Sequence, residues 1–191
     1  YYIAAKDLSY KLNSLNKMGD IKFKIADTVK EKKIIIKKMI EQKRQRYKAT
    51  EVWDMLSNIF HRNFYINLST IKNKDVDIHC SAYYLDNEII ATHVGLTLNK
   101  TFYYLMPSQP SKGFKKYSLG SLLLIELFQW SFQNNYKFFD LTIGDEHYKS
   151  KWADVKSPLY SFLTTKTLKG FIYKFLFRSI NVIKKFPILS R

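Results

Sequence analysis

The chain has 191 residues, of which 46% are hydrophobic, and it carries a formal net charge of +16. Its length suits one well-buried domain with flanking segments, and no apolar run of about 18 residues predicts a membrane span. Cys80 is the only cysteine, which excludes an intramolecular disulfide and a zinc site built on thiolates. A single cysteine favours a reducing, cytoplasmic setting.

The positive charge is concentrated in two segments. Residues 22–48 contain eleven basic and three acidic residues, and residues 166–191 contain seven basic residues and no acidic one. Residues 49–165 balance at eleven of each sign. The charge invites a nucleic-acid role, but nearly all of the excess lies in these two segments, and solvated surface lysines explain it equally well. Because the chain begins Tyr1-Tyr2 without a leader, we also suspect that its start is a truncation.

Two helices are predicted before the first strands. Residues 28–48 mix basic and apolar residues at a spacing that predicts a helix with one apolar side. From Thr50 to Ile71 apolar residues again recur at helical spacing, and Thr50 has the side chain of an N-cap. The pattern thus predicts a second helix that begins at Thr50.

The next segments predict a mixed sheet. Residues 78–84, 89–98 and 101–106 are separated by short polar turns and predict an antiparallel meander. A helix at 119–134, apolar almost all round, leads to a strand at 138–143. Because a helix joins them, this strand should lie parallel to residues 101–106.

Three further elements are predicted at the C-terminal end of the chain. A short helix is followed by a final strand at 158–165. From Leu168 to Ile183 apolar residues alternate with basic ones at helical spacing. Such a basic amphipathic helix either lies on an anionic membrane or packs against protein.

Two motifs carry the functional information. Residues 117–123 read Tyr-Ser-Leu-Gly-Ser-Leu-Leu, and residues 139–152 read Phe-Asp-Leu-Thr-Ile-Gly-Asp-Glu-His-Tyr-Lys-Ser-Lys-Trp. Small residues at a helix start let backbone N–H groups approach an anion, although an ordinary helix cap uses the same residues. The polar cluster in the second motif follows a strand, where α/β folds place their ligands.

With these motifs the chain resembles the GNAT acyltransferase superfamily, specifically its CelD-like branch of cellulose and exopolysaccharide biosynthesis, which is related to FemAB transferases. Leu119 stands where that branch has proline. The resemblance implies an α/β fold with a mixed central sheet, an antiparallel meander, flanking helices and a parallel strand pair that splays at the cofactor site. It also implies a remnant of a preceding half-domain or a linker at 1–26, the acyltransferase domain at 27–165 and a basic C-terminal helix at 166–191.

The resemblance implies an N-acyltransferase that uses acetyl-CoA or another acyl-CoA. The acceptor would be an amine of a sugar or of a cell-envelope or exopolysaccharide precursor, and the amine would attack the thioester directly. The expected location is the cytoplasm, with peripheral contact at the inner face of the membrane as an option. Two alternatives are a FemAB-like transferase that takes its acyl group from aminoacyl-tRNA, and a non-catalytic module that binds membrane or nucleic acid through its basic flanks.

The same resemblance implies that backbone amides at the start of the central helix bind the donor's pyrophosphate. The expected cofactor-binding residues are Lys115, Lys116, Tyr117, Ser118, Leu119, Gly120 and Ser121.

Acyl transfer to an amine needs a proton acceptor and a proton donor for the departing thiolate. Glu146 or Asp145 is the expected base, and Tyr148 resembles the tyrosine that serves many GNAT enzymes as the acid. Asp140 is a further candidate, or a hydrogen-bonded structural acid. His93, on a central strand, is either a catalytic histidine or a structural one.

Two residues of the second motif are candidates for substrate binding. Lys149 binds an anionic substrate or pairs with Glu146, and Trp152 is either a substrate platform or a packing residue. The other three histidines, His61, His79 and His147, have no metal-ligand spacing, so we expect no metal.

Overall fold

The computed structural model of the chain describes residues 2–160 and 162–183. It divides into two compact units, Tyr1–Lys149 and Ser150–Arg191. In chain order, the helices are α1 (Tyr2–Asn16), α2 (Val29–Ala49), α3 (Ile59–Leu68), α4 (Leu119–Gln133) and α5 (Leu168–Ile183). The strands are β1 (Ile21–Ile25), β2 (Val76–Leu85), β3 (Glu88–Leu98), β4 (Thr101–Ser108) and β5 (Phe138–Asp140). Three short 3₁₀ turns, η1 (Met55–Ser57), η2 (Lys115–Tyr117) and η3 (Lys149–Lys151), complete these elements.

The five strands form one mixed sheet in the order β1-β2-β3-β4-β5. The pairs β1–β2, β2–β3 and β3–β4 are antiparallel, and β5 runs parallel to β4. This confirms the predicted α/β fold class with its antiparallel meander and its parallel pair. The segment expected as a remnant contributes β1, which pairs with β2, while the division of the chain at residues 26 and 165 stays a prediction.

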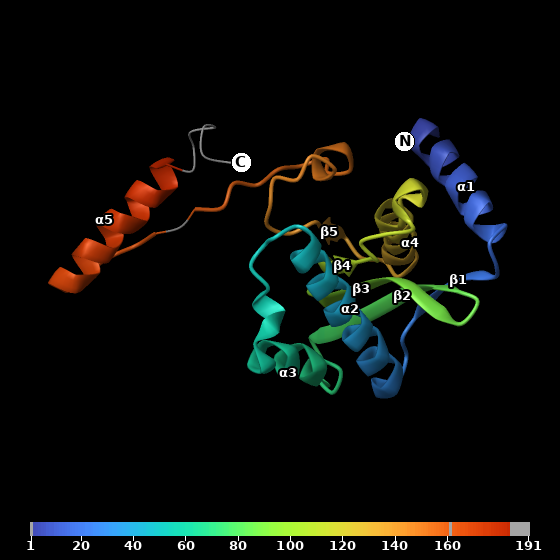
Figure 1. Cartoon of the computed structure of the whole chain (residues 1–191), viewed down its shortest axis with the longest axis horizontal. Coiled ribbons are helices and arrows are strands. Elements are labelled where there is room, and N and C mark those ends of the chain that lie inside the picture. The colour runs from blue at the N-terminus through green and yellow to red at the C-terminus, as the bar shows by residue number, and fades with distance from the viewer. Residues whose placement is uncertain (1, 161, 184–191) are drawn as a thin grey trace. The chain divides into compact units, whose positions relative to one another are not determined.

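Helices α2 and α4 cover opposite faces of the sheet (Figure 1). The helix α2 begins with a capping box, in which the Thr28 hydroxyl accepts the Glu31 N–H and the Glu31 carboxylate accepts the Thr28 N–H. Its apolar side packs on alternate residues of β2 and β3, forming the core of Ala26, Ile35, Ile36, Met39, Ile40, Leu56, Ile78, Cys80, Ala82 and Val94. The predicted helix at 28–48 is therefore confirmed.

The prediction of one helix from Thr50 to Ile71 is wrong. Thr50 is the C-cap of α2, and its hydroxyl donates to the Arg46 carbonyl at 2.9 Å. Glu51 then adopts a left-handed conformation, with φ 54°, which ends the helix. A new helix, α3, starts only after Asn58, whose side chain accepts the Phe60 N–H. Apolar spacing continues across the break, so periodicity alone does not show it.

The parallel strand is shorter than predicted, and the final strand is absent from the described residues. β5 ends at Asp140, and its carboxylate accepts the N–H of Thr142, whose φ of 62° turns the chain out of the sheet. Residues 158–160 and 162–165 are not in a strand. Pro158 has no N–H to donate to a ladder, which fits this result.

A bulge in β4 interrupts its regular pairing with β3 in the middle of the sheet. Gly95 of β3 stands opposite two residues of β4, because the register shifts by one between Val94 and Leu96. A Cβ at Gly95 would clash with the Tyr103 carbonyl oxygen and the His93 ring. Only glycine fits this position without a shift of its neighbours.

Two imidazoles lie in the aromatic core between the sheet and α4. His93 is fully buried and stacks on Tyr104 with ring centroids 4.8 Å apart, and His79 contacts Trp130 at 4.5 Å. Among the described residues, no group forms a hydrogen bond with either ring. Burial lowers the pKa of His79 to about 3 and lowers that of His93 well below its usual value. Both rings are therefore neutral near neutral pH.

These histidines predict a loss of stability in mild acid. The unfolded chain binds protons at both rings below pH 6.5, whereas folded His79 binds one only near pH 3, so stability is complete above pH 6.5 and falls below it. Each ring contributes a slope of about 1.4 kcal/mol per pH unit in this window. The free energy of unfolding, measured with urea at several pH values between about 7.5 and 5, should vary less steeply with pH in His79→Leu than in the wild type. An unchanged slope in His79→Leu would contradict the account.

Candidate functional site

The candidate site lies where the parallel strands part. Pairing between β4 and β5 stops at Tyr103 and Asp140, but β4 continues to Ser108. The carboxyl ends of parallel strands are the usual position of ligands in α/β sheets. The start of α4, the loop 141–149 and the second half of α2 provide the candidate residues.

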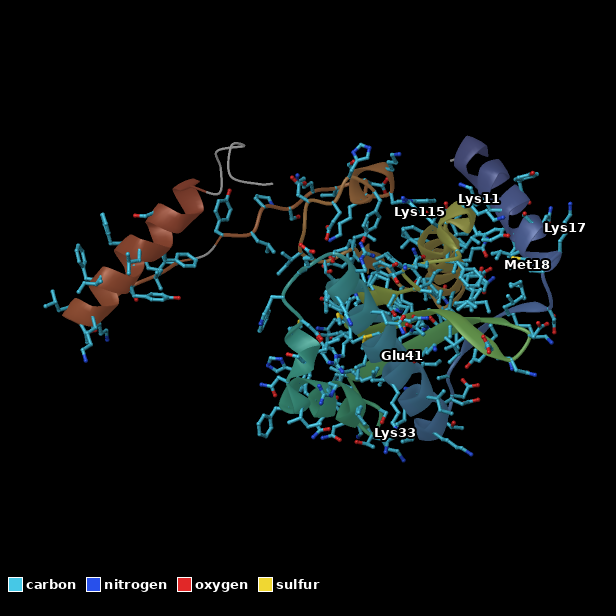
Figure 2. The ribbon with its side chains drawn as sticks, in the orientation of Figure 1. Lys11, Lys17, Met18, Lys33, Glu41 and Lys115 are labelled. Carbon is cyan, nitrogen blue, oxygen red and sulfur yellow. The ribbon has the colours of Figure 1, made fainter. Side chains whose placement is uncertain are left out.

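The start of α4 is an open, positively charged helix terminus. Ser118 is its N-cap, with φ 52°, but its side chain does not cap the helix and instead accepts a hydrogen bond from Lys11 Nζ of α1 at 3.1 Å. The space beside Gly120 is open, since a Cβ there would meet only Gln109 Oε1 at 3.7 Å. Figure 2 labels Lys11 and Lys115, which lie on α1 and on η2, the two elements in contact here. Backbone N–H groups with nearby lysines suit a phosphate group.

The structure brings the seven predicted cofactor-binding residues together in η2 and the first turn of α4. Lys115 and Lys116 are exposed, and Lys116 lies over the Tyr117 ring at 4.9 Å. Tyr117 and Leu119 are buried and anchor the turn, while Ser118, Gly120 and Ser121 are partly exposed. The buried side chains of Tyr117 and Leu119 thus keep the small residues beside them at the surface.

The loop 141–149 is held in place by one lysine. Lys149 Nζ donates to the carbonyls of Thr142 at 3.3 Å and Ile143 at 2.8 Å, and it pairs with the Glu146 carboxylate at 2.9 Å. Gly144 has φ 130°, and a side chain there would clash with Glu146. Pairing with Glu146 is one of the two roles expected of Lys149, and substrate binding by Lys149 stays a prediction.

Glu146 and Tyr148 have different protonation states at neutral pH. The Lys149 hydrogen bond lowers the pKa of Glu146, whose side chain is 57% exposed, so the carboxylate is charged. Partial burial, helped by the charge of Glu146, raises the pKa of Tyr148, so its phenol keeps its proton. An ionised carboxylate and a protonated phenol within one loop can accept and donate protons, respectively.

The other predicted catalytic residues lie in different surroundings. Asp145 is exposed and Asp140, also exposed, holds the Thr142 N–H at 2.6 Å. His93 lies in the aromatic core, with ring contacts to His79, Phe102 and Tyr104. Trp152 belongs to the second unit. Their catalytic or substrate-binding roles stay predictions.

Sequence reasoning missed a polar cluster between α2 and the end of β4. Gln42 Oε1 accepts hydrogen bonds from Ser108 Oγ at 2.8 Å and Thr92 Oγ1 at 3.3 Å, and all three residues are buried. The next residue, Lys43, is half-buried. A signal was available, because Gln42 and Lys43 lie seven residues after the buried Ile35 and Ile36 and so share their side of the helix.

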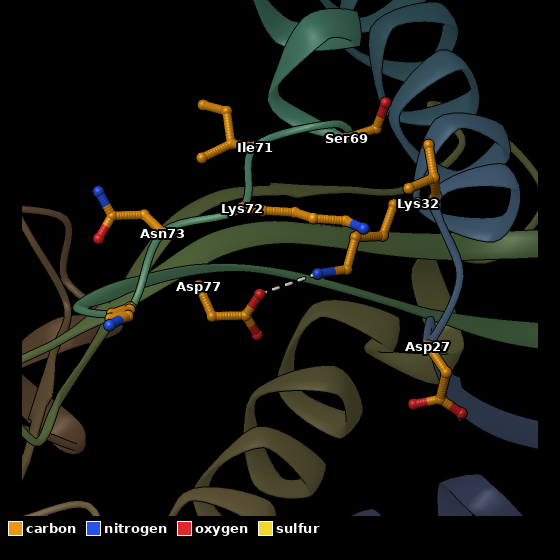
Figure 3. Close-up of a pocket in the computed structure, with 9 residues that line it drawn as sticks. Asp27, Lys32, Ser69, Ile71, Lys72, Asn73 and Asp77 are labelled. Carbon is orange, nitrogen blue, oxygen red and sulfur yellow. Dashed lines mark hydrogen bonds and ion pairs between the residues drawn. The ribbon is translucent and has the colours of Figure 1, made fainter.

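A separate cavity of about 500 Å³ lies at the other end of α2 (Figure 3). Its lining residues include Lys32, Lys72 and Asp77, and Lys32 pairs with Asp77 at 3.0 Å. Lys32 precedes Lys43 by about three helical turns. This cavity is therefore distinct from the candidate site at the end of β4.

The described residues contain no group of three or more His, Cys, Asp or Glu side chains that could hold a metal ion. Burial raises the pKa of the Cys80 thiol, so it is not a reactive thiolate. Within the same part of the chain, every helix is too short or too polar to cross a membrane.

The fold is similar to solved acetyltransferase structures. A possible acetyltransferase from Clostridium difficile 630 superposes with a TM-score of 0.55 at 10% identity, over 76% of this chain and 99% of that one. An aminoglycoside acetyltransferase from an uncultured soil metagenomic sample, in complex with sisomicin, superposes with a TM-score of 0.51 at 11% identity, over 77% and 97% of the two chains. A second aminoglycoside acetyltransferase from such a sample gives 0.52 at 11% identity, over 77% and 99%.

No curated protein sequence matches the chain. The family model of the acetyltransferase (GNAT) domain matches residues 4–150, which contain the whole sheet and the loop 141–149. The chain therefore belongs to the GNAT acetyltransferase family.

Proposed function

We propose that this acetyltransferase transfers the acyl group of acetyl-CoA, or of another acyl-CoA, to an amine of a sugar or of a cell-envelope or exopolysaccharide precursor. GNAT acetyltransferases generally use acetyl-CoA. The observation that carries the proposal is the uncapped start of α4 with Gly120 and Lys11. The sisomicin complex of one structural neighbour supports a small-molecule amine as the acceptor.

In the proposed reaction the donor's pyrophosphate binds the first N–H groups of α4, and its thioester arm enters where β4 and β5 part. The neutral acceptor amine attacks the carbonyl carbon, so that a C–N bond forms and the C–S bond breaks. The proton of the acceptor's ammonium form goes to Glu146 or Asp145, directly or through water. Tyr148 donates its proton to the departing thiolate, and the proton that the nitrogen loses as the amide forms restores the Tyr148 phenol.

The protonation states of the loop support these roles. Tyr148 remains a proton donor at neutral pH, because burial raises its pKa. Glu146 remains an acceptor, because the Lys149 hydrogen bond lowers its pKa. Because its pKa is lowered, Glu146 is a weak base. It therefore suits a role in which it passes the proton of the amine on to bulk water and does not keep it.

Binding of acetyl-CoA is the first test. Isothermal titration should show saturable binding, and at a concentration of 100 Kd the ligand should stabilise the fold by about 2.7 kcal/mol. Gly120→Trp should weaken binding at least about tenfold, because the indole would fill the approach to the α4 amides. Ser111→Trp, in the exposed loop before η2, is the matched control and should bind normally.

Two other results would contradict the donor assignment. Absence of acetyl-CoA binding with salt-sensitive affinity for tRNA would favour the aminoacyl-tRNA-dependent alternative. Absence of both would favour a non-catalytic module.

Substitutions in the loop test the proton transfers. Tyr148→Phe and Glu146→Gln should each lower kcat by about 10² while the KM for acetyl-CoA stays the same, since general acid–base groups contribute about 10²–10⁴. Glu88→Gln, an exposed acid at the start of β3, is the control. Steady-state kinetics with a saturating amine measures these effects, and full activity of both loop variants would reject the assigned roles.

We further propose that residues 166–191 bring the enzyme to the inner face of an anionic membrane. Residues 168–183 form the predicted helix α5, and residues 166–191 contain seven basic residues and no acidic one. Lys169 and Lys174 alternate with apolar residues such as Phe171 and Phe175, as in interfacial helices. Residues 184–191 lie outside the part of the chain that the structure describes.

Sedimentation with lipid vesicles tests this contact. The protein should bind vesicles that contain phosphatidylglycerol and should not bind vesicles of phosphatidylcholine alone. The double variant Lys169→Glu, Lys174→Glu should lose most of this binding, whereas charge reversal of Lys72 and Lys74, which belong to the first unit, should not. Equal binding by both double variants would contradict a specific role for α5.

A further inference from the structure

We infer that Lys43, with Arg46 one turn further along α2, binds an anionic group on the acceptor, such as a phosphate or a carboxylate. This inference rests on the proposed N-acyltransferase function and specifies the class of its acceptor. It gives a role to a cation that no internal contact explains.

Lys43 stands on the protein side of α2 rather than on its solvent side. It follows the buried Met39 and Ile40 by four and three residues, which is the spacing of one helix face. The preceding residue, Gln42, is 2% exposed and is hydrogen-bonded to Ser108 at the end of β4. The ammonium is thus partly removed from water, which is costly for an uncompensated charge.

The two other half-buried lysines of α2 and the exposed Arg44 have carboxylate partners, whereas Lys43 does not. Lys32 pairs with Asp77 at 3.0 Å, Lys38 with Glu41 at 3.0 Å and Arg44 with Asp54 at 2.9 Å. Within the part of the chain that the structure describes, the Lys43 ammonium has neither a hydrogen bond nor an ion pair. Its surroundings therefore leave room for an external anion.

The electrostatic surroundings of Lys43 also favour an anion. Glu146 acts on it from the loop after β5, but that carboxylate already pairs with Lys149. Arg46 repels it from the same helix, and His93 on β3 is buried and neutral. Burial, followed by Arg46, lowers the pKa of Lys43 to about 8. An anion beside Lys43 would stabilise its charged form and offset the cost of burial.

The position of Lys43 links this anion to the acceptor. Gln42 is tied to the last residue of β4, and Glu146 belongs to the loop proposed to handle the amine's proton. An acceptor whose amine lies near this loop can therefore present a second group to α2. The same two cations would repel a polycationic amine, so aminoglycosides should be poor acceptors.

Acetylation of matched amines tests the inference with the full chain and acetyl-CoA. Glucosamine is compared with glucosamine 6-phosphate, which adds a phosphate, and with muramic acid, which adds a carboxylate. We expect kcat/KM to be at least about tenfold higher for an anionic acceptor, through a lower KM. The better of the two anionic acceptors identifies the group, and sisomicin should be the poorest acceptor.

Three variants separate binding from folding. Lys43→Met should remove the preference for the anionic acceptor, Lys43→Arg should keep it, and Lys48→Met near the exposed end of α2 should behave as wild type. As the pH rises from 7 to 9 the wild-type preference should fall, because Lys43 loses its proton near pH 8. Lys43→Arg, which stays charged, should keep its preference at pH 9.

The outcomes distinguish the two levels of the proposal. If acetyl-CoA binds and glucosamine is acetylated as well as both anionic amines, with no effect of Lys43→Met, the inference is wrong and the proposed function stands. If acetyl-CoA does not bind and no amine is acetylated, the proposed function fails and the inference fails with it.

Discussion

The short parallel contact between β4 and β5 is the constraint on which the rest of the structure depends. Three residue pairs join the two strands before Thr142 turns the chain away, and the Thr142 hydroxyl then donates to the Tyr104 carbonyl at 3.1 Å. Among the described residues, no strand pairs with the end of β4 on that side. The proposed function places the donor arm here, between the α4 terminus and the loop that carries Glu146 and Tyr148.

Charge is arranged differently on the two faces of the sheet. On the α4 face, His79 and His93 are buried as neutral rings and contribute packing with Trp130 and Tyr104. On the α2 face, Lys43 is a partly buried group that no internal acid pairs with. The two buried imidazoles stabilise the fold only at a pH at which they stay neutral. The unpaired ammonium of Lys43 is best explained by an anionic ligand. The same physical cost of burying charge thus has a structural consequence on one face and a functional one on the other.

Much of the sheet was predictable from the sequence, because alternation and polar turns specify an antiparallel meander locally. The parallel placement of β5 followed from its helical connection to β4. The break after α2 was not predictable from periodicity, since it depends on the left-handed Glu51 and on the new cap at Asn58. The early end of β5 depends on the Asp140 side chain and the φ of Thr142, which no hydrophobic pattern records.

The candidate site was predictable only in part. The 115–121 and 139–152 motifs indicated the helix terminus and the loop, but the contribution of Lys11 depends on the packing of α1 against η2. Lys43 was hidden among the basic residues of α2, although its spacing from Met39 and Ile40 placed it on their side.

A crystal structure with bound coenzyme A would test the central claim most directly. We expect the pyrophosphate at the N–H groups of Leu119 and Gly120, since the Ser121 N–H already donates to the Ser118 carbonyl at 2.8 Å, and we expect the thiol end between β4 and β5 near Tyr148. Binding of the pyrophosphate at another place, such as the cavity beside Lys32 and Lys72, would contradict the account.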